Sequence, residues 1–235
     1  MVPPYRVEKD LKKHSSKIGL RTIFLLYEGQ NTEHCLINPL LSSNAIVRAG
    51  FARFRPIVKE GKDVGITDPF SLVKYAKSFI RKEIKNNNFV SGRDKVMIVF
   101  DLDRLNNDQT KMDLLLKQRT NDMIYCYTNP AIELFLLLTL NQGYEQIIEP
   151  NAKAIVANEK NAQGERFVYR LALDNVPGYS KRADADFRFV LDNIANALAQ
   201  EKRINNKLNQ AANKLTSNIA YVLNKIADND FDIKY

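Results

Sequence analysis

Residues 22–27 read Thr-Ile-Phe-Leu-Leu-Tyr, a short and almost wholly apolar run that is followed by Glu-Gly at 28–29. The run is too brief for a helix, and its composition suits a β-strand that is buried on both faces. The same pattern recurs at residues 96–100 and 123–127. Helix-like segments follow each run, so we expect an α/β fold with a mainly parallel β-sheet flanked by helices.

Helix signals fill the connections between these runs. Caps and apolar spacing predict helices over about 31–47, 68–86 and 106–118, and another that Asn129 caps with Pro130 in its first turn. After Pro177-Gly178 the pattern becomes helical, with apolar stripes at 187–198 and 219–226 and a basic stretch at 202–213 that should continue or bend the first of these helices. Residues 55–68 and 157–164 are expected to be loops.

The chain of 235 residues is long enough to bury a large core without staples. We expect a basic N-terminal segment at 1–20, an α/β core at 21–178 and a helical C-terminal portion at 179–235 that packs on the core. Cys35 and Cys126 form no CxxC pair and are expected to be inert buried thiols of a reducing compartment. Two histidines, His14 and His34, are too few for a multi-histidine metal site.

Membrane insertion and secretion are disfavoured by the sequence. The N-terminus has no apolar segment of the signal-peptide kind, and no run approaches the ~18 apolar residues of a membrane span. The most apolar run, 131–140, is short and contains Glu133, so it reads as a core helix. We therefore expect a cytoplasmic protein that makes no use of a membrane.

The net charge of +8 is unevenly distributed along the chain. Residues 48–95 carry a net charge of +7, whereas residues 22–47 carry −2 and residues 96–180 carry −3. If folding gathers the acidic segments, a carboxylate cluster would lie inside a basic rim, as in metal-dependent enzymes that act on polyanions. A solvated basic surface explains the same charges.

Three carboxylates are placed to meet at one edge of the predicted sheet. Asp101 and Asp103 follow the second strand, and alternate residues of an extended segment face the same way. Glu28 ends the first strand and precedes Gly29, which allows close backbone approach. Oxygen ligands of this kind suit Mg²⁺ or Mn²⁺, although aspartate is also common where a strand turns into a loop.

Three further residues have both a functional and a structural interpretation. Glu133, near the start of an apolar helix, is either an additional carboxylate or acceptor at the site or the partner of a basic residue such as Arg104. Arg104 could neutralise phosphate charge or pair with Asp103. Glu33 is favoured as a capping-box partner at a helix N-terminus, with support of the Glu28 corner as the alternative.

Candidate nucleic-acid contacts lie in two basic segments. Phe51 and Phe54 lie among arginines, a mixture that single-strand binders use, although core packing is the commoner role of such rings. The loop after Gly178 could grip a backbone phosphate or be a plain exposed loop. The residues concerned are Arg48, Arg53, Arg55, Tyr179, Lys181 and Arg182.

A family resemblance rests on the same landmarks. A strand followed by Glu-Gly and a later strand followed by Asp-x-Asp is similar to the Toprim domain. More narrowly, the chain resembles the RloB-like family of bacterial abortive-infection and restriction-associated loci. The landmarks are 26–33 (LYEGQNTE), 99–103 (VFDLD), 129–137 (NPAIELFLL), 176–181 (VPGYSK) and 215–219 (LTSNI), and together they place the resemblance over about residues 20–228.

This resemblance implies Mg²⁺-dependent endonucleolytic cleavage of RNA or DNA during antiphage defence. Glu28 matches the Toprim glutamate, and Asp101 with Asp103 matches its aspartate pair. The chain has no P-loop, so an ATPase would be a separate partner protein from the same locus. The alternative is a non-catalytic module that docks a nucleic acid or a partner protein. A topoisomerase is disfavoured because the chain is too small for strand passage.

Overall fold

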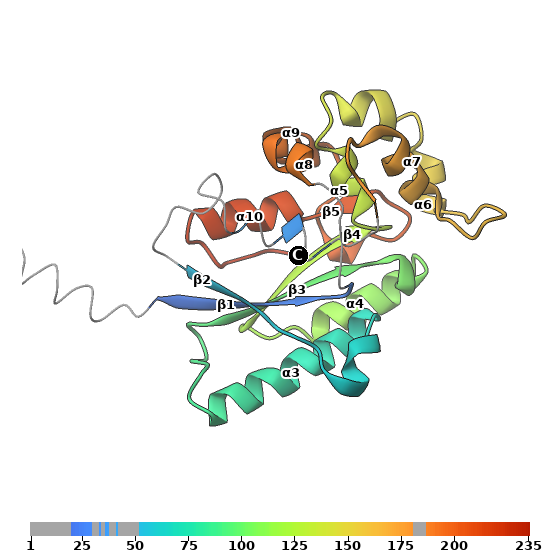
Figure 1. The fold of residues 1–235 in the computed structure, drawn as a ribbon. Helices are drawn as coiled ribbons and strands as arrows, with labels where there is room; N and C mark the ends of the chain where they lie inside the picture. Colours follow the sequence, from blue (N-terminus) through green and yellow to red (C-terminus); the bar gives the residue numbers. More distant parts are fainter. Residues whose placement is uncertain (1–19, 30–32, 34–35, 38–40, 42–51, 181–186) are drawn as a thin grey trace, which may run out of the picture.

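The computed structural model describes residues 20–29, 33, 36–37, 41, 52–180 and 187–235. Its centre is a five-stranded sheet with the strand order β2-β1-β3-β4-β5 (Figure 1). The first four strands are parallel, and β5 pairs antiparallel with β4. The strands are β1 (Arg21–Tyr27), β2 (Ala52–Pro56), β3 (Lys95–Asp101), β4 (Met123–Asn129) and β5 (Thr216–Ser217).

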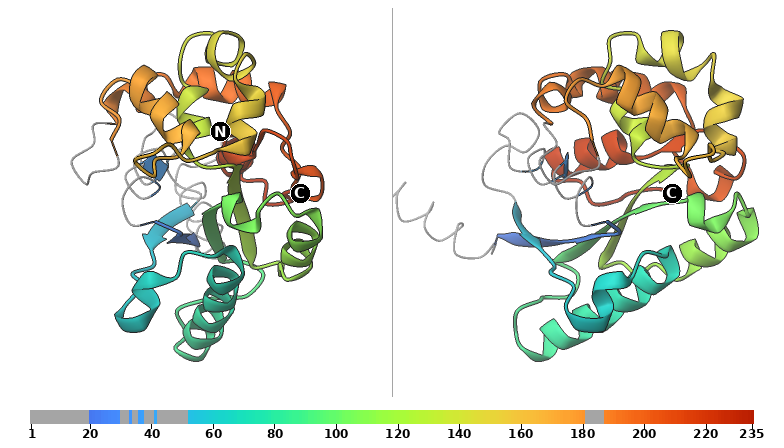
Figure 2. Two further views of the ribbon diagram at one scale, coloured as in Figure 1. Left: turned by 90° about the vertical axis from the view of Figure 1, so that its right-hand side faces the viewer. Right: turned by 45° about the vertical axis from the view of Figure 1, so that its right-hand side comes forward.

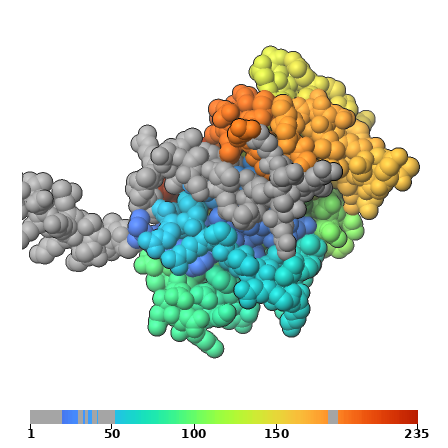
Figure 3. Space-filling view, viewed as in Figure 1, coloured from blue at the N-terminus to red at the C-terminus, as the bar shows by residue number. Residues whose placement is uncertain are grey.

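Helices cover both faces of the sheet, so the predicted α/β fold is confirmed. Figure 2 shows α3 and α4 on one side and the remaining α-helices on the other, and Figure 3 shows the yellow and orange residues of α6 to α9 on the opposite side of the molecule from the green residues of α3. The α-helices are α3 (Pro69–Lys85), α4 (Gln109–Lys117), α5 (Glu133–Leu137), α6 (Ala152–Ala157), α7 (Phe167–Asn175), α8 (Arg188–Asp192), α9 (Ile194–Gln200) and α10 (Ile219–Ala227). Short turns of other helix types are η1 (Gly61–Gly65), η2 (Asp103–Leu105), η3 (Tyr144–Ile148), η4 (Glu201–Arg203) and η5 (Leu208–Gln210).

The near-continuous apolar runs arise because the central strands have a core on each side. In β1, Ile23 and Leu25 belong to the core beneath α5 and α10, whereas Phe24 and Leu26 belong to the core beneath α3 and α4. Successive side chains of a strand point to opposite faces, so both sets must be apolar. Sequence analysis predicted these strands for this reason.

Local capping signals also gave the expected helices. The Asp68 carboxylate accepts a hydrogen bond from Ser71 N at 3.0 Å and caps α3, which has Pro69 in its first turn. Asp108 caps α4 by accepting from Lys111 N at 3.2 Å. Both side chains satisfy backbone N–H groups that have no partner within the helix.

The outer side of β4 is closed by side chains as well as by β5. The Asn218 amide lies along the strand, accepting from Tyr127 N at 2.8 Å and donating to Tyr125 O at 2.9 Å. The Tyr235 hydroxyl accepts from Tyr125 N at 2.9 Å. Asn218 thus takes the place of a strand residue at the point where the two-residue β5 has ended.

A helix follows β4 as predicted, in α5, but its predicted start was wrong, and so was the helical continuation predicted over residues 202–213. Asn129 does not cap a helix, because it is the last residue of β4 and its amide donates to the Asn107 side chain, Ala211 O and Lys214 O, each at 3.0 Å. Residues 202–213 do not continue a helix either. They form η4, η5 and a bridge at Asn205, whose side chain donates to Lys207 O and so competes with helical pairing.

Other segments differ in detail. The expected loop at 55–68 begins inside β2 and contains η1, and the stripe at 187–198 is divided between α8 and α9 at Asn193. Most of the predicted helix at 31–47 lies outside the described residues, although residues 33, 36, 37 and 41 are helical and buried. In the part of the chain that the structure describes, none of the helices has the length and apolarity needed to cross a bilayer.

Candidate functional site at the carboxyl edge of the sheet

Glu28 lies immediately beyond β1, where the backbone ladder with β3 gives way to a side-chain contact. Its N–H donates to Val99 O at 2.9 Å, which continues the pairing by one residue. Its carboxylate Oε2 then accepts from Asp101 N at 2.9 Å. This bond holds the Glu28 carboxylate at the end of β3, and the residue is only 9% exposed. The sequence prediction that Glu28 and Asp101 converge is therefore met by direct contact.

Asp101 is positioned from the other side by β4. It is paired with Thr128 in the parallel register, and Thr128 Oγ1 donates to Asp101 Oδ1 at 2.7 Å. The backbone then turns, with Leu102 N donating to Thr128 O at 2.8 Å and Asp103 N to Pro130 O at 3.1 Å. The Asp101 carboxylate is thus held between the ends of β1 and β4, at the edge where parallel α/β sheets place their ligands.

Asp103 begins η2 and is more open to solvent than Asp101. Its Oδ2 lies 3.7 Å from Arg166 Nη2, in an ion pair with a residue that directly precedes α7. Arg104 is exposed, and its charge acts on Glu28 by lowering the pKa of that carboxyl. The predicted pairing of Asp103 is therefore made with Arg166, which is 63 positions away and gave no signal in the sequence.

Glu133 brings a further carboxylate to the cluster from the first turn of α5. It is 2% exposed, and its Oε1 accepts from the Tyr179 hydroxyl at 2.7 Å. Its charge is near enough to raise the pKa of Asp101. Tyr179, predicted as a contact to nucleic acid, is itself buried. Its hydroxyl is used to bond Glu133 and is not exposed for contact with a phosphate.

Glu33 and Lys59 complete the surroundings of Glu28. Glu33 is buried, and its carboxylate lies against Gly29, where an added side chain would require it to shift. Lys59 Nζ donates to Glu28 O and to Ile66 O, both at 2.8 Å. The lysine therefore ties the β1 corner to the segment between β2 and α3 and brings a positive charge to it.

The electrostatics of the cluster are dominated by burial and by repulsion between carboxylates. Burial raises the pKa of Glu28 to about 8, opposed by the Asp101 N–H and assisted by Glu33 and Asp103. Burial also raises the pKa of Asp101 well above its usual value, and the four neighbouring carboxylates add to the shift. A buried like-charged group of this kind takes up protons or a cation. The members are Glu28, Glu33, Asp101, Asp103 and Glu133.

The donor set fits a hard divalent cation in its chemistry. All the contributing groups are carboxylates, and Mg²⁺ and Mn²⁺ prefer oxygen ligands. Glu28 and Asp101 each use one oxygen to accept a hydrogen bond. Among the described residues, however, no three His, Cys, Asp or Glu side chains are already gathered as a metal site. Binding of a cation would therefore require these carboxylates to turn toward one another.

Of the remaining residues predicted to contact nucleic acid, the structure describes two, and neither has a described contact with the carboxylate cluster. Arg53 and Arg55 are exposed on β2, and Phe54 between them packs against the core. Arg48, Phe51, Lys181 and Arg182 lie outside the described residues. Cys126 is a buried free thiol on β4, and burial raises its pKa. Thr128, Arg166 and Lys59 were missed by sequence analysis because their roles arise only from the folded contacts.

Comparison with known proteins identifies the family of the chain. The fold and the carboxylates at the ends of β1 and β3 define an α/β protein with an acidic site at the carboxyl edge of its sheet. The family profile described as RloB-like protein matches residues 23–226. The chain belongs to the RloB-like family. No curated protein and no solved structure matches it.

Proposed function

We propose that the protein is a metal-dependent nuclease that hydrolyses phosphodiester bonds of RNA or DNA. The observation that carries the proposal is the contact of the Glu28 carboxylate with the backbone N–H of Asp101. It brings the acidic ends of two adjacent strands together, as the Toprim pattern of Glu-Gly and Asp-x-Asp requires. The family supports a role in bacterial antiphage defence, in which a partner ATPase from the same locus would supply the nucleotide-driven step.

In this proposal Asp101 and Asp103 would hold Mg²⁺ or Mn²⁺, and Glu28 would either ligate the ion or take the proton of the attacking water. The bound ion would withdraw charge from a non-bridging phosphate oxygen and favour ionisation of the attacking water. Thr128 donates a hydrogen bond to Oδ1 of Asp101, which leaves Oδ2 as the oxygen that would ligate the ion. Arg166 and Arg104, at the open side of the cluster, would reduce the negative charge that a phosphate meets on approach.

Glu28 is suited to handle the proton of the attacking water. A carboxyl whose pKa is about 8 exchanges its proton near neutral pH, which is the range in which a general base is most effective. The water oxygen forms the new bond to phosphorus, its proton passes to Glu28, and the bond to the leaving oxygen breaks. That oxygen then takes up a proton. Glu133 accepts a hydrogen bond from Tyr179, and its charge raises the pKa of Asp101.

Cleavage by charge-neutral variants tests this proposal. We expect Glu28→Gln and Asp101→Asn each to lower cleavage of RNA and DNA substrates by about 10³-fold in Mg²⁺ or Mn²⁺, since each removes a proposed ligand. The exposed Glu149 provides a control, and Glu149→Gln should cleave as the wild type does. A 5′-phosphate product formed at an unchanged rate by Asp101→Asn would refute the mechanism.

The competing function is a non-catalytic module that binds nucleic acid or a partner protein. The observation in its favour is that no group of three metal-ligating side chains is already assembled among the described residues. The same variants separate the two functions. If the protein is a binding module, neither the wild type nor the variants would show metal-dependent cleavage. Its affinity for nucleic acid would be unchanged when Asp101 is replaced by asparagine.

A further inference from the structure

We infer that the groove between α3 and η1 binds single-stranded nucleic acid and leads it to the carboxylate cluster. The groove has a volume of about 580 Å³ and is open to solvent. This inference names the form of substrate for the proposed nuclease and rests on that function. The residues that line it are Lys62, Asp63, Ile66, Ser71, Lys74, Tyr75, Ser78, Phe79 and Lys82.

Charge complementarity identifies a polyanion as the occupant. Three lysines line the groove against one carboxylate, Asp63. The helix that forms its floor is also basic, since α3 carries five lysine or arginine residues and a single acidic residue, Glu83. Each of the exposed cations of α3 releases little free energy on its own, but a row of them attracts a phosphate backbone strongly.

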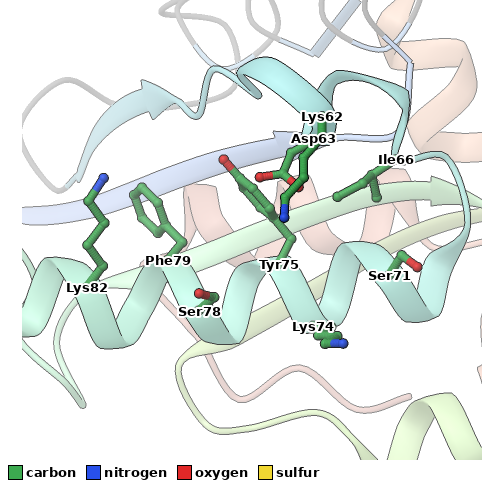
Figure 4. A pocket seen from close by; sticks show the side chains of 9 residues that line it. All are labelled: Lys62, Asp63, Ile66, Ser71, Lys74, Tyr75, Ser78, Phe79 and Lys82. Atoms are coloured by element: carbon green, nitrogen blue, oxygen red, sulfur yellow. The ribbon is translucent and has the colours of Figure 1, made fainter.

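Aromatic side chains point to bases rather than to phosphates alone. Figure 4 shows Tyr75 and Phe79 rising from α3 toward the turn that carries Lys62 and Asp63, with Lys82 at one end of the row. Both rings are half-buried. Phe79 makes an edge contact with Phe24, with the ring centroids 5.1 Å apart, and packs against the core. Rings that alternate with lysines are the means by which single strands are held without base pairing.

The groove is connected to the carboxylate cluster by one side chain. Ile66, which lines the groove, accepts a hydrogen bond from Lys59, and the same ammonium donates to the backbone carbonyl of Glu28. Ser71, also in the lining, is bonded to the cap of α3 at the carboxyl edge of the sheet. A nucleic-acid strand that follows the groove to Ile66 would therefore be one lysine side chain away from the Glu28 corner.

The excess of positive charge in the groove ends near Lys82. A second hollow of about 590 Å³ shares Tyr75, Phe79 and Lys82 and extends toward β2. There Arg55 is opposed by Glu60 and Glu83. The excess of positive charge is thus confined to the part of the groove between Lys82 and Ser71, and the strand is expected to leave the surface near Lys82.

Binding without catalysis tests the inference. The probes are a fluorescein-labelled oligoribonucleotide of about 12 nucleotides, the same sequence as DNA, and its duplex. Their affinities for the full chain are measured by fluorescence anisotropy in EDTA over a series of salt concentrations. The RNA and DNA arms show which sugar is preferred, and both single strands should bind more tightly than the duplex.

Charge reversal in the groove provides the main variant. We expect Lys62→Glu combined with Lys82→Glu to weaken single-strand binding by at least about tenfold. Two lost phosphate contacts should reduce the slope of log K against log salt by about 1.4. The control combines Lys117→Glu with Lys202→Glu, which are exposed lysines outside both the groove and α3. This control changes the net charge equally and should alter affinity by less than about threefold.

The aromatic contact has its own variants. Tyr75→Ala should weaken binding by about tenfold because a stacked base is lost, whereas Tyr75→Phe keeps the ring and should bind normally. Equal losses in the groove pair and the control pair, or equal binding of duplex and single strand, would overturn the inference. Cleavage by Asp101→Asn with groove-dependent binding intact would overturn only the proposed nuclease function, so the two failures are distinguishable.

Discussion

Two buried carboxylate regions of this molecule are treated in opposite ways. Glu201, in η4, is 4% exposed and lies against the start of α10. It accepts hydrogen bonds from the Ser217 hydroxyl, from Ala220 N at 3.0 Å and from Tyr221 N at 2.9 Å. These donors oppose the effect of burial on its pKa. Burial still raises the pKa of Glu201, but the donors at the helix N-terminus favour its charged form from within the protein.

Among the described residues, the two central carboxylates of the Asp101 cluster each accept fewer hydrogen bonds than Glu201 does. Glu28 receives one backbone N–H, Asp101 receives one hydroxyl, and the nearest strong field on each is that of other carboxylates. The comparison shows that burial does not by itself mark a functional acid. What separates the two regions is whether the protein supplies the balancing donors or leaves them to be supplied by a ligand.

The largest effect on the free energy of unfolding is expected at Glu201. Glu201→Ala removes the acceptor of three donors at the start of α10, so the free energy of unfolding should fall by about 3 kcal/mol. This corresponds to a decrease in Tm of about 6–12 °C for a chain of this size. Urea denaturation measures the effect. Glu201→Gln retains an acceptor oxygen and should lose less, and a loss below about 1 kcal/mol in both variants would contradict the comparison.

Removal of charge from the Asp101 cluster should change the free energy of unfolding in the opposite direction. Without metal, Asp101→Asn relieves repulsion while keeping an acceptor for Thr128, so stability should be unchanged or higher by about 1–2 kcal/mol. Asp94 is the matched control because it is buried but accepts from Thr22 N, Val90 N and Arg93. Asp94→Asn should be destabilised in the same urea titration. Equal destabilisation of the two variants would remove the distinction between the regions.

The pH dependence of stability sharpens the comparison further. The folded chain holds the Glu28 proton more tightly than the unfolded chain, because burial raises the pKa of this carboxyl to about 8. Its contribution is complete below about pH 4.5 and is lost as pH rises to about 8. Subtracting the Tm of Glu28→Gln from that of the wild type in EDTA should therefore give a difference that falls as the pH rises through this range.

Addition of Mg²⁺ provides the second half of that measurement. The ion should restore the high-pH stability of the wild type and have little effect on Glu28→Gln, because it binds the ionised cluster. A difference in Tm that does not vary with pH would show that Glu28 keeps an ordinary pKa. In that case the cluster would not need a cation.

The smallest effect is expected beneath the cluster. Tyr179→Phe removes the hydroxyl that donates to Glu133, at a cost of about 1 kcal/mol in the free energy of unfolding. Cleavage should fall by less than about tenfold, because Glu133 acts through Asp101 and not on the phosphate. Thermal unfolding and a cleavage assay on the same preparation measure both. A cleavage loss as large as that of Asp101→Asn would move Glu133 into the reaction itself.

The parts of the fold that could be predicted are those with a local signal. The runs at β1, β3 and β4 are apolar on both faces, and Asp68 and Asp108 precede helices as caps. Strand β2 was not recognised because it lies at the edge and alternates exposed arginines with half-buried residues. Strand β5 consists of two residues, which is too short for any periodic pattern.

The site divides along the same line. Glu28 and Asp101 could be brought together from sequence because parallel strands share one carboxyl edge, and Asp101 N–Glu28 is the contact that results. The partners of these carboxylates could not be predicted. Arg166 and Tyr179 come from distant turns whose positions depend on how the helices pack, and the pattern around Tyr179 indicated a loop contact to phosphate rather than a buried partner of Glu133.

The closure of β4 by Asn218 and Tyr235 bears on how copies of this protein meet. An open strand edge offers its N–H and C=O groups to other chains and promotes β-sheet aggregation. Here the Asn218 amide and the Tyr235 hydroxyl form hydrogen bonds with those backbone groups of β4. A side chain in this place offers no backbone ladder to which another strand could add. Intermolecular strand addition at this side would have to displace both, which leaves β2 as the edge where self-association through the sheet could begin.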